Sequence, residues 1–251
     1  MALWCERASR MSLFNTRFIT TSTSSTSSPR INKSTNVHHQ KLKILCVHGY
    51  GQNGISFRQK SGSIRRAAKT CVSEWDFIEA KLKAPAREDE TNDGADGLAW
   101  WLWNRSHNNP INTGYEDSIN HLIQHLEKNG PFDGVMGFSQ GASILALLLA
   151  EQEERGANWF QFGVFIGGFL PRMPIMRTKI ITNCVDTSIP TWHSFGLSDE
   201  IIPAEMSQEL IKCFGKNVTV CPAHPGGHLV SSTKEVRLSF KSFLEERKRN
   251  K

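Results

Sequence analysis

The chain has 251 residues, 39% of them hydrophobic, which is enough to bury the core of one α/β domain of ordinary size. Residues 1–43 hold seven Lys/Arg and one acidic residue, whereas residues 44–251 hold 23 of each, so the net charge of +6 lies in the N-terminal stretch. The near-neutral remainder argues against nucleic-acid binding, and no apolar run approaches the ~20 residues of a membrane span.

The first 40 residues are rich in Ser and Thr and contain several arginines but a single acidic residue, Glu6. This composition is typical of a mitochondrial or plastid transit peptide, and a disordered N-terminal tail would have the same low complexity. We therefore expect residues 1–42 to form a disordered or targeting extension ahead of a folded domain at residues 43–251. The six cysteines include no Cys-x-x-Cys pair, which indicates reduced thiols in an intracellular protein.

From residue 43 onward, short apolar runs alternate with amphipathic stretches. The apolar runs predict strands at residues 44–47, 76–79, 134–136, 162–166, 191–195 and 218–221. The amphipathic stretches predict helices at residues 57–71, 116–128, 140–151, 204–214 and 232–248. Residues 84–114, interrupted by proline and glycine, predict a long loop beside the sheet. The alternation is typical of an α/β fold with a mostly parallel central sheet flanked by helices.

Residues 137–141 read Gly-Phe-Ser-Gln-Gly and lie between a predicted strand and a predicted helix. Small residues two positions before and after a serine allow a turn tight enough to expose its hydroxyl, the arrangement called the nucleophile elbow. Ser139 is therefore the candidate nucleophile of a serine hydrolase.

A serine hydroxyl is a weak nucleophile, so acyl transfer needs a histidine that takes its proton and a carboxylate that orients the histidine. Asp199 follows the predicted strand at residues 191–195, and His228 lies in a glycine-rich turn after the next strand. The chain order Ser, Asp, His is that of α/β hydrolases, in which loops after parallel strands meet at one edge of the sheet. Glu200 and His224 remain alternatives for the acid and the base.

The tetrahedral intermediate of acyl transfer also needs backbone donors for its oxyanion. The N–H of Gln140, directly after the nucleophile, is one candidate, and the N–H of Tyr50, in a glycine-rich turn after the first strand, is the other. Three tryptophans stand together in the long loop. They either pack against the domain or line a substrate pocket for an acyl chain. They are Trp100, Trp101 and Trp103.

Three segments of the chain carry a resemblance to a known family. They are residues 45–54 (LCVHGYGQNG), 130–142 (GPFDGVMGFSQGA) and 224–228 (HPGGH). Together they resemble the FSH family of serine hydrolases, and the likeness extends over roughly residues 43–246. The resemblance implies an α/β-hydrolase fold without a large cap domain, no cofactor and a cytoplasmic location. It also implies hydrolysis of carboxylic esters with longer alkyl chains, and a triad of Ser139, Asp199 and His228.

We therefore expect a serine esterase that hydrolyses small-molecule esters of medium to long chain length through an acyl-serine intermediate. An acyl thioesterase or lysophospholipase would use the same machinery, and a hydrolase fold kept as a non-catalytic binding protein is a further alternative. A zinc site at Cys221, His224 and His228 would need another ligand that the sequence does not supply, so no metal is expected. The sequence leaves the oligomeric state open.

Overall fold

The computed structural model describes residues 40–85, 97–104 and 111–251, apart from the side chains of residues 103–104 and 111–113. The predicted extension at residues 1–42 lies almost wholly outside the described residues, so its boundary stays a prediction. In the part of the chain that is described, no helix is both long enough and apolar enough to cross a membrane.

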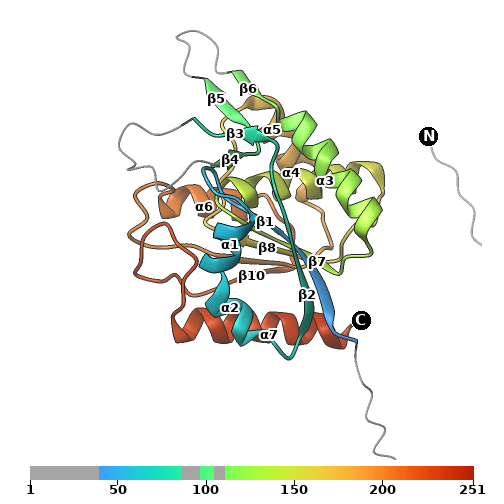
Figure 1. Cartoon of the computed structure of the whole chain (residues 1–251), viewed down its shortest axis with the longest axis vertical. Coiled ribbons are helices and arrows are strands. Elements are labelled where there is room, and N and C mark those ends of the chain that lie inside the picture. Colours follow the sequence, from blue (N-terminus) through green and yellow to red (C-terminus); the bar gives the residue numbers. More distant parts are fainter. Residues whose placement is uncertain (1–39, 86–96, 105–110) are drawn as a thin grey trace, which may run out of the picture. The chain divides into compact units, whose positions relative to one another are not determined.

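Six strands form one central sheet (Figure 1). In chain order they are β1 (Leu42–Val47), β2 (Val72–Ile78), β7 (Gly134–Phe138), β8 (Gly163–Ile166), β9 (Thr191–Ser194) and β10 (Val218–Val220). Their spatial order is β10-β9-β8-β7-β1-β2, and every neighbouring pair is parallel. The sheet confirms the predicted fold class, and each strand lies within a few residues of its predicted position.

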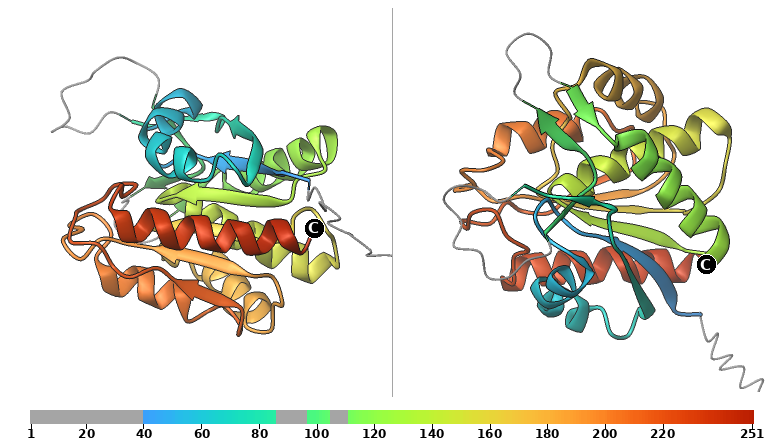
Figure 2. Two further views of the ribbon diagram at one scale, coloured as in Figure 1. Left: turned by 90° about the horizontal axis from the view of Figure 1, so that it is seen from below. Right: turned by 45° about the horizontal axis from the view of Figure 1, so that its top comes forward.

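Helices cover both faces of the sheet (Figure 2). Along β1, Ile44 and Cys46 enter one core cluster and Leu45 and Val47 the other, because successive side chains of a strand point to opposite faces. The first cluster is covered by α1 (Gly54–Lys60), α2 (Gly62–Ala67) and α7 (Lys234–Arg249). The second is covered by α3 (Tyr115–Asn129), α4 (Gln140–Arg155), α5 (Pro174–Cys184) and α6 (Ala204–Ile211).

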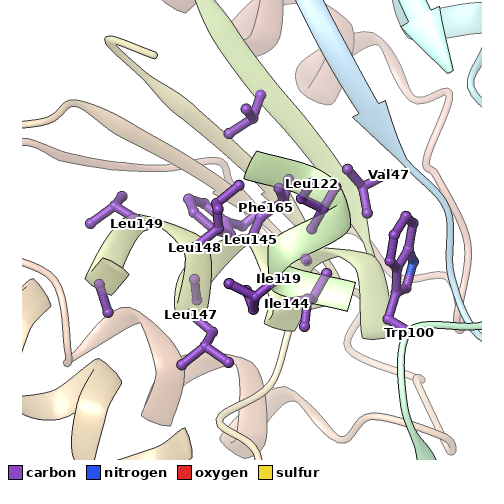
Figure 3. Close-up of a cluster of buried hydrophobic side chains, with 14 of the residues drawn as sticks. Val47, Trp100, Ile119, Leu122, Ile144, Leu145, Leu147, Leu148, Leu149 and Phe165 are labelled. Atoms are coloured by element: carbon purple, nitrogen blue, oxygen red, sulfur yellow. The ribbon is translucent and has the colours of Figure 1, made fainter. Parts of the chain in front are cut away.

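Helix α4 lies deep in the second core cluster. Figure 3 shows its leucines close to Phe165 of β8 and Leu122 of α3. Every residue from 140 to 150 is buried, so the apolar side chains surround the helix instead of forming one stripe. The core therefore holds the whole first half of this helix in place.

The helices differ from the prediction at two places. The single helix predicted at residues 57–71 is wrong, because the chain breaks at Ser61 into α1 and α2. The hydroxyl of Ser61 donates to the carbonyl of Phe57 at 2.7 Å, a local bond that competes with regular helix, and Gly62 follows. Helix α5 was not among the predicted helices, although Pro174 at its first turn and buried residues at a spacing of four (Met176, Ile180 and Cys184) are helix signals.

The long loop predicted at residues 84–114 is wrong in part, because short strands occur there. Strand β3 (Leu82–Lys83) pairs with β4 (Leu98–Ala99), and β5 (Leu102–Asn104) pairs with β6 (Ile111–Thr113), both antiparallel. Strands of two or three residues are too short for apolar alternation to reveal them.

Candidate active site

Ser139 lies in a strained turn between β7 and α4. It is the one non-glycine residue of the described ranges with a positive φ, at 53°. A Cβ on Gly141 would lie 2.3 Å from the carbonyl oxygen of Val47, and a Cβ on Gly137 would lie 2.6 Å from that of Gly141. Both positions therefore require glycine. The N–H of Ser139 donates to the carbonyl of Ile166 at 2.8 Å, which fixes the turn to the end of β8.

Asp199 and His228 contact each other directly. Nδ1 of His228 lies 2.7 Å from Oδ2 of Asp199, and both side chains are largely buried. The other carboxylate oxygen, Oδ1, accepts the N–H groups of Ile201 at 3.0 Å and Ile202 at 2.8 Å. With Nδ1 donating to Asp199, Nε2 of the neutral ring is the nitrogen that can accept a proton.

The two alternatives from the sequence do not share this contact. Glu200 is exposed, and among the described residues neither Glu200 nor His224 is hydrogen bonded to Asp199 or His228. Burial lowers the pKa of His224, and the Asp199 charge opposes this only in part. His224 therefore lies beside the carboxylate as a buried neutral ring.

The end of β8 brings Ser139 and His228 to the same place. The N–H of Ser139 is hydrogen bonded to the carbonyl of Ile166. A Cβ on Gly167, which follows Ile166, would lie 3.3 Å from Cε1 of His228. Phe138, the residue before the serine, packs its ring against His228 with centroids 4.8 Å apart. The predicted nucleophile and base thus adjoin one short stretch of backbone.

The turn after β1 also approaches the serine. A Cβ on Gly49 would lie 3.3 Å from Cβ of Ser139. The N–H of Gly49 donates within the turn to Oε1 of Gln52 at 3.1 Å, and the N–H of Gly51 donates to the carbonyl of Leu98 at 2.9 Å. These bonds hold the backbone around Tyr50 in a defined conformation next to the nucleophile.

The backbone N–H of Gln140 stands at the first position of α4, where a helix offers no carbonyl acceptor. Such an N–H, at the positive end of a helix, favours an anion. The sequence-based candidates for the oxyanion donors, Gln140 and Tyr50, therefore lie on two segments that flank Ser139.

The side chain of Gln140 has a role that the sequence did not reveal. Its Oε1 accepts the N–H of Trp100 at 2.9 Å, and its Nε2 donates to the carbonyl of Trp101 at 2.8 Å. These two hydrogen bonds, here called the Gln140 clamp, hold residues 97–104 against the turn that carries Ser139. A glutamine in a sequence gives no indication of a partner 39 or 40 residues away.

Trp100 and Trp101 pack inside the domain. Trp100 has no exposed surface, and its indole N–H donates to the carbonyl of His48 at 2.8 Å. Trp101 is 4% exposed and packs edge-on against Phe169. The side chain of Trp103 lies outside the described residues. Packing against the domain, one of the two alternatives drawn from the sequence, describes Trp100, while the pocket role of Trp101 stays a prediction.

His48 is hydrogen bonded through both ring nitrogens to backbone groups of the same region. Its Nε2 accepts the N–H of Ala80 at 3.1 Å, so the proton is on Nδ1, which donates to the carbonyl of Gly49 at 2.8 Å. Burial lowers its pKa and keeps the ring neutral. As for metals, no three His, Cys, Asp or Glu side chains stand together in a metal-binding arrangement in the described ranges.

The family described as "Serine hydrolase (FSH1)" matches residues 37–240. Esterase OVCA2 of Danio rerio is 36% identical over 230 residues, which are 81% of this chain and 96% of that protein. Esterase CG5412 of Drosophila melanogaster is 33% identical over 83% of this chain and 75% of its own length.

Solved structures share the fold. The crystal structure of Zea mays acyl-protein thioesterase 2 matches with a TM-score of 0.59 at 19% identity, over 83% of this chain and 94% of the other. The Bacillus cereus carboxylesterase matches with a TM-score of 0.57 at 17% identity, over 83% and 90%.

Proposed function

The chain belongs to the serine hydrolase (FSH1) family, as the resemblance predicted, and from that premise we propose that it hydrolyses carboxylic esters through an acyl-Ser139 intermediate. The observation that carries the proposal is the 2.7 Å contact between His228 and Asp199 beside the strained turn at Ser139. The contact fixes the tautomer of the histidine, and the turn presents the hydroxyl.

In the proposed reaction, Nε2 of His228 takes the proton of the Ser139 hydroxyl as the oxygen attacks the ester carbonyl carbon. The negative charge on the carbonyl oxygen is stabilised by the N–H groups of Gln140 and Tyr50. The tetrahedral intermediate collapses when the alkoxide leaves and receives the proton from His228. Water, deprotonated by the same nitrogen, then attacks the acyl-serine, and the carboxylic acid is released as Ser139 regains its proton.

Exposed apolar side chains support a preference for medium- to long-chain esters. Leu197 and Ile201 flank Asp199 and are 62% and 51% exposed, and Leu229, next to His228, is 47% exposed. Large apolar side chains left in water beside a reactive group favour an apolar ligand. We propose that these three residues contact the hydrocarbon chain of the substrate.

The activity itself is tested with a fluorophosphonate probe, which labels an activated serine. We expect labelling of the parent protein, none of Ser139→Ala and strongly reduced labelling of His228→Ala, while His224→Ala keeps its labelling. An unlabelled parent with intact circular dichroism would favour the binding-protein alternative. Labelling that survives in Ser139→Ala would place the nucleophile elsewhere.

The chain-length preference is tested with p-nitrophenyl esters of increasing acyl length, with matching thioesters to separate an esterase from a thioesterase. Leu197→Ser and Leu229→Ser should lower kcat/KM for long esters and leave short ones unchanged. Leu238→Ser, an equally exposed leucine on α7 (56%), is the matched control. Trp101→Ala tests the pocket role of that tryptophan. An unaltered length profile in all variants would contradict the proposed contact with the hydrocarbon chain, and a parent that does not favour longer esters would contradict the preference itself.

A further inference from the structure

A basic groove lies between α2 and α7, two helices that run side by side on the face away from α4 (Figures 1 and 2). Its volume is about 430 Å³. No acidic residue lines it. Five of the lining residues are basic, namely Arg66, Lys69, Lys234, Arg237 and Lys241, and the others are Ser63, Ala67 and Leu238.

Among the described residues, only one of the five basic side chains of this groove has an ion-pair partner. Lys241 is paired with exposed Glu245 at 3.5 Å. The other four basic side chains contact no carboxylate of the described residues. Because residues 44–251 carry equal numbers of basic and acidic residues, the groove is a local concentration of charge and not the surface of a generally basic domain.

The basic residues of the groove that lie on α7 are not placed where they would stabilise that helix. Lys234, Arg237 and Lys241 are three and four residues apart, so they share one face of α7. Lys234 and Arg237 stand in the first turn, where the positive end of the helix dipole repels cations, and the first turn also contains one acidic residue, Glu235. A bound anion would offset the repulsion among the basic side chains and their repulsion by the helix end, because it would be attracted by the side chains and by the N-terminus of the helix.

Leu238 indicates the kind of anion. It lies among the basic residues of the groove, and it is 56% exposed. Basic side chains around an exposed leucine suit a membrane surface, where the cations meet phosphate headgroups and the apolar side chain enters the lipid. We propose that the basic groove docks the protein on membranes that contain anionic lipids.

The test uses the full chain, sedimented with phosphatidylcholine vesicles with and without phosphatidylserine. Neutralising Lys234 and Arg237 together (Lys234→Gln, Arg237→Gln) should weaken binding to the anionic vesicles about 25-fold, at about fivefold for each charge. The matched control is Lys212→Gln with Lys216→Gln, two exposed lysines beyond α6. Both double variants keep the basic residues 1–43, so any contribution of that stretch cancels in the comparison.

The proposal is supported if the groove variant loses binding, the control keeps it, and added salt weakens both parent and control. It is overturned if both variants bind like the parent, or if the parent does not sediment with anionic vesicles. Binding of soluble inositol hexakisphosphate to the groove without any vesicle binding would also overturn it, in favour of a soluble phosphate ligand. Circular dichroism and Tm of each variant show that the fold is retained.

Discussion

Nδ1 of His228 lies 2.7 Å from Oδ2 of Asp199, while Oδ1 of the same carboxylate accepts two backbone N–H groups, from Ile201 and Ile202. Each oxygen therefore has a separate task. Oδ1 holds the side chain to its own loop, and Oδ2 is left for the histidine.

Asp199→Asn should lower kcat about 10³- to 10⁴-fold with little change in the fold. The amide oxygen can still accept from the loop N–H groups, so the amide nitrogen then faces His228 and forces its proton to Nε2. The measurement is kcat on a soluble ester. Glu200→Gln, at the exposed neighbouring acid, should keep full activity. Comparable losses of kcat in Asp199→Asn and Glu200→Gln would mean that the 2.7 Å contact does not identify the catalytic carboxylate.

Gln140→Leu should lower both stability and kcat. It leaves the buried N–H of Trp100 and the carbonyl of Trp101 without partners, at a cost of about 2 kcal/mol or more in the free energy of unfolding. Because these two residues are held against the turn that carries Ser139, loss of the hydrogen bonds should also make the position of Ser139 less fixed and so lower kcat. Urea unfolding and steady-state kinetics measure the two effects.

The matched control for this clamp is Gln152→Leu. The Gln152 amide pairs in the same way with backbone groups of Trp159 and Phe160, but at the far end of α4. It should lose a similar amount of stability and keep its kcat. If the two variants keep equal kcat, the clamp at Gln140 is purely structural.

Gly141→Ala should unfold or strongly destabilise the protein, because its Cβ would lie 2.3 Å from one backbone oxygen and 2.4 Å from another. Gly62→Ala is the contrasting case. Nothing lies within 4 Å of a Cβ there, and the residue is helical, so this change should raise stability by about 0.5–1 kcal/mol. Thermal unfolding compares the two, and a Gly141→Ala variant with the parent's Tm would refute the packing argument.

Burial of His193 should make stability fall in mild acid. The ring is buried between Phe165 and Phe214, and burial lowers its pKa from 6.5 to about 3. Below pH 6.5 the unfolded chain binds a proton that the folded one rejects until about pH 3, so stability is lost as pH falls through this window. The expected loss between pH 7 and pH 5 is about 2 kcal/mol for this one residue.

His193→Gln should remove that part of the pH dependence. The bond from the ring to Thr191 is lost at both pH values, so it cancels in the comparison. His48 and His224, whose pKa values burial also lowers, remain and act in the same direction. Urea unfolding at both pH values gives the difference, and an unchanged pH dependence in the variant would rule out His193 as its source.

The sheet was predictable because its four inner strands, β1, β7, β8 and β9, are buried on both faces. An uninterrupted apolar run such as 44–47 stands out from its polar surroundings, and it needs no knowledge of the partner strand. The break at Ser61 depends on one local hydrogen bond to Phe57, which a serine can form but need not form, so the sequence does not decide it. The short pair β3–β4 depends on a partner distant in the chain, which no window of local sequence contains.

The candidate site divides in the same way. Ser139, Asp199 and His228 follow strand ends, so fold topology alone predicts that their loops converge. The clamp from Gln140 to Trp100 joins two segments whose spacing follows no rule, and it could only be seen in three dimensions. Location in the cell, whether cytoplasmic or directed to an organelle by residues 1–42, stays a prediction that fluorescent fusions with and without that stretch would test.

Because α4 is surrounded by core side chains, the nucleophile at its first turn is positioned by the interior of the domain and not by its own loop. Leu197 and Ile201 lie in the loop after β9, and Leu229 lies in the loop after β10. All three side chains are exposed. Substrate preference can therefore diverge among relatives by exchange of these surface residues while the reacting oxygen keeps its place. The buried residues that position the nucleophile and the exposed residues beside Asp199 and His228 are therefore separate sets, and a change in one set need not disturb the other.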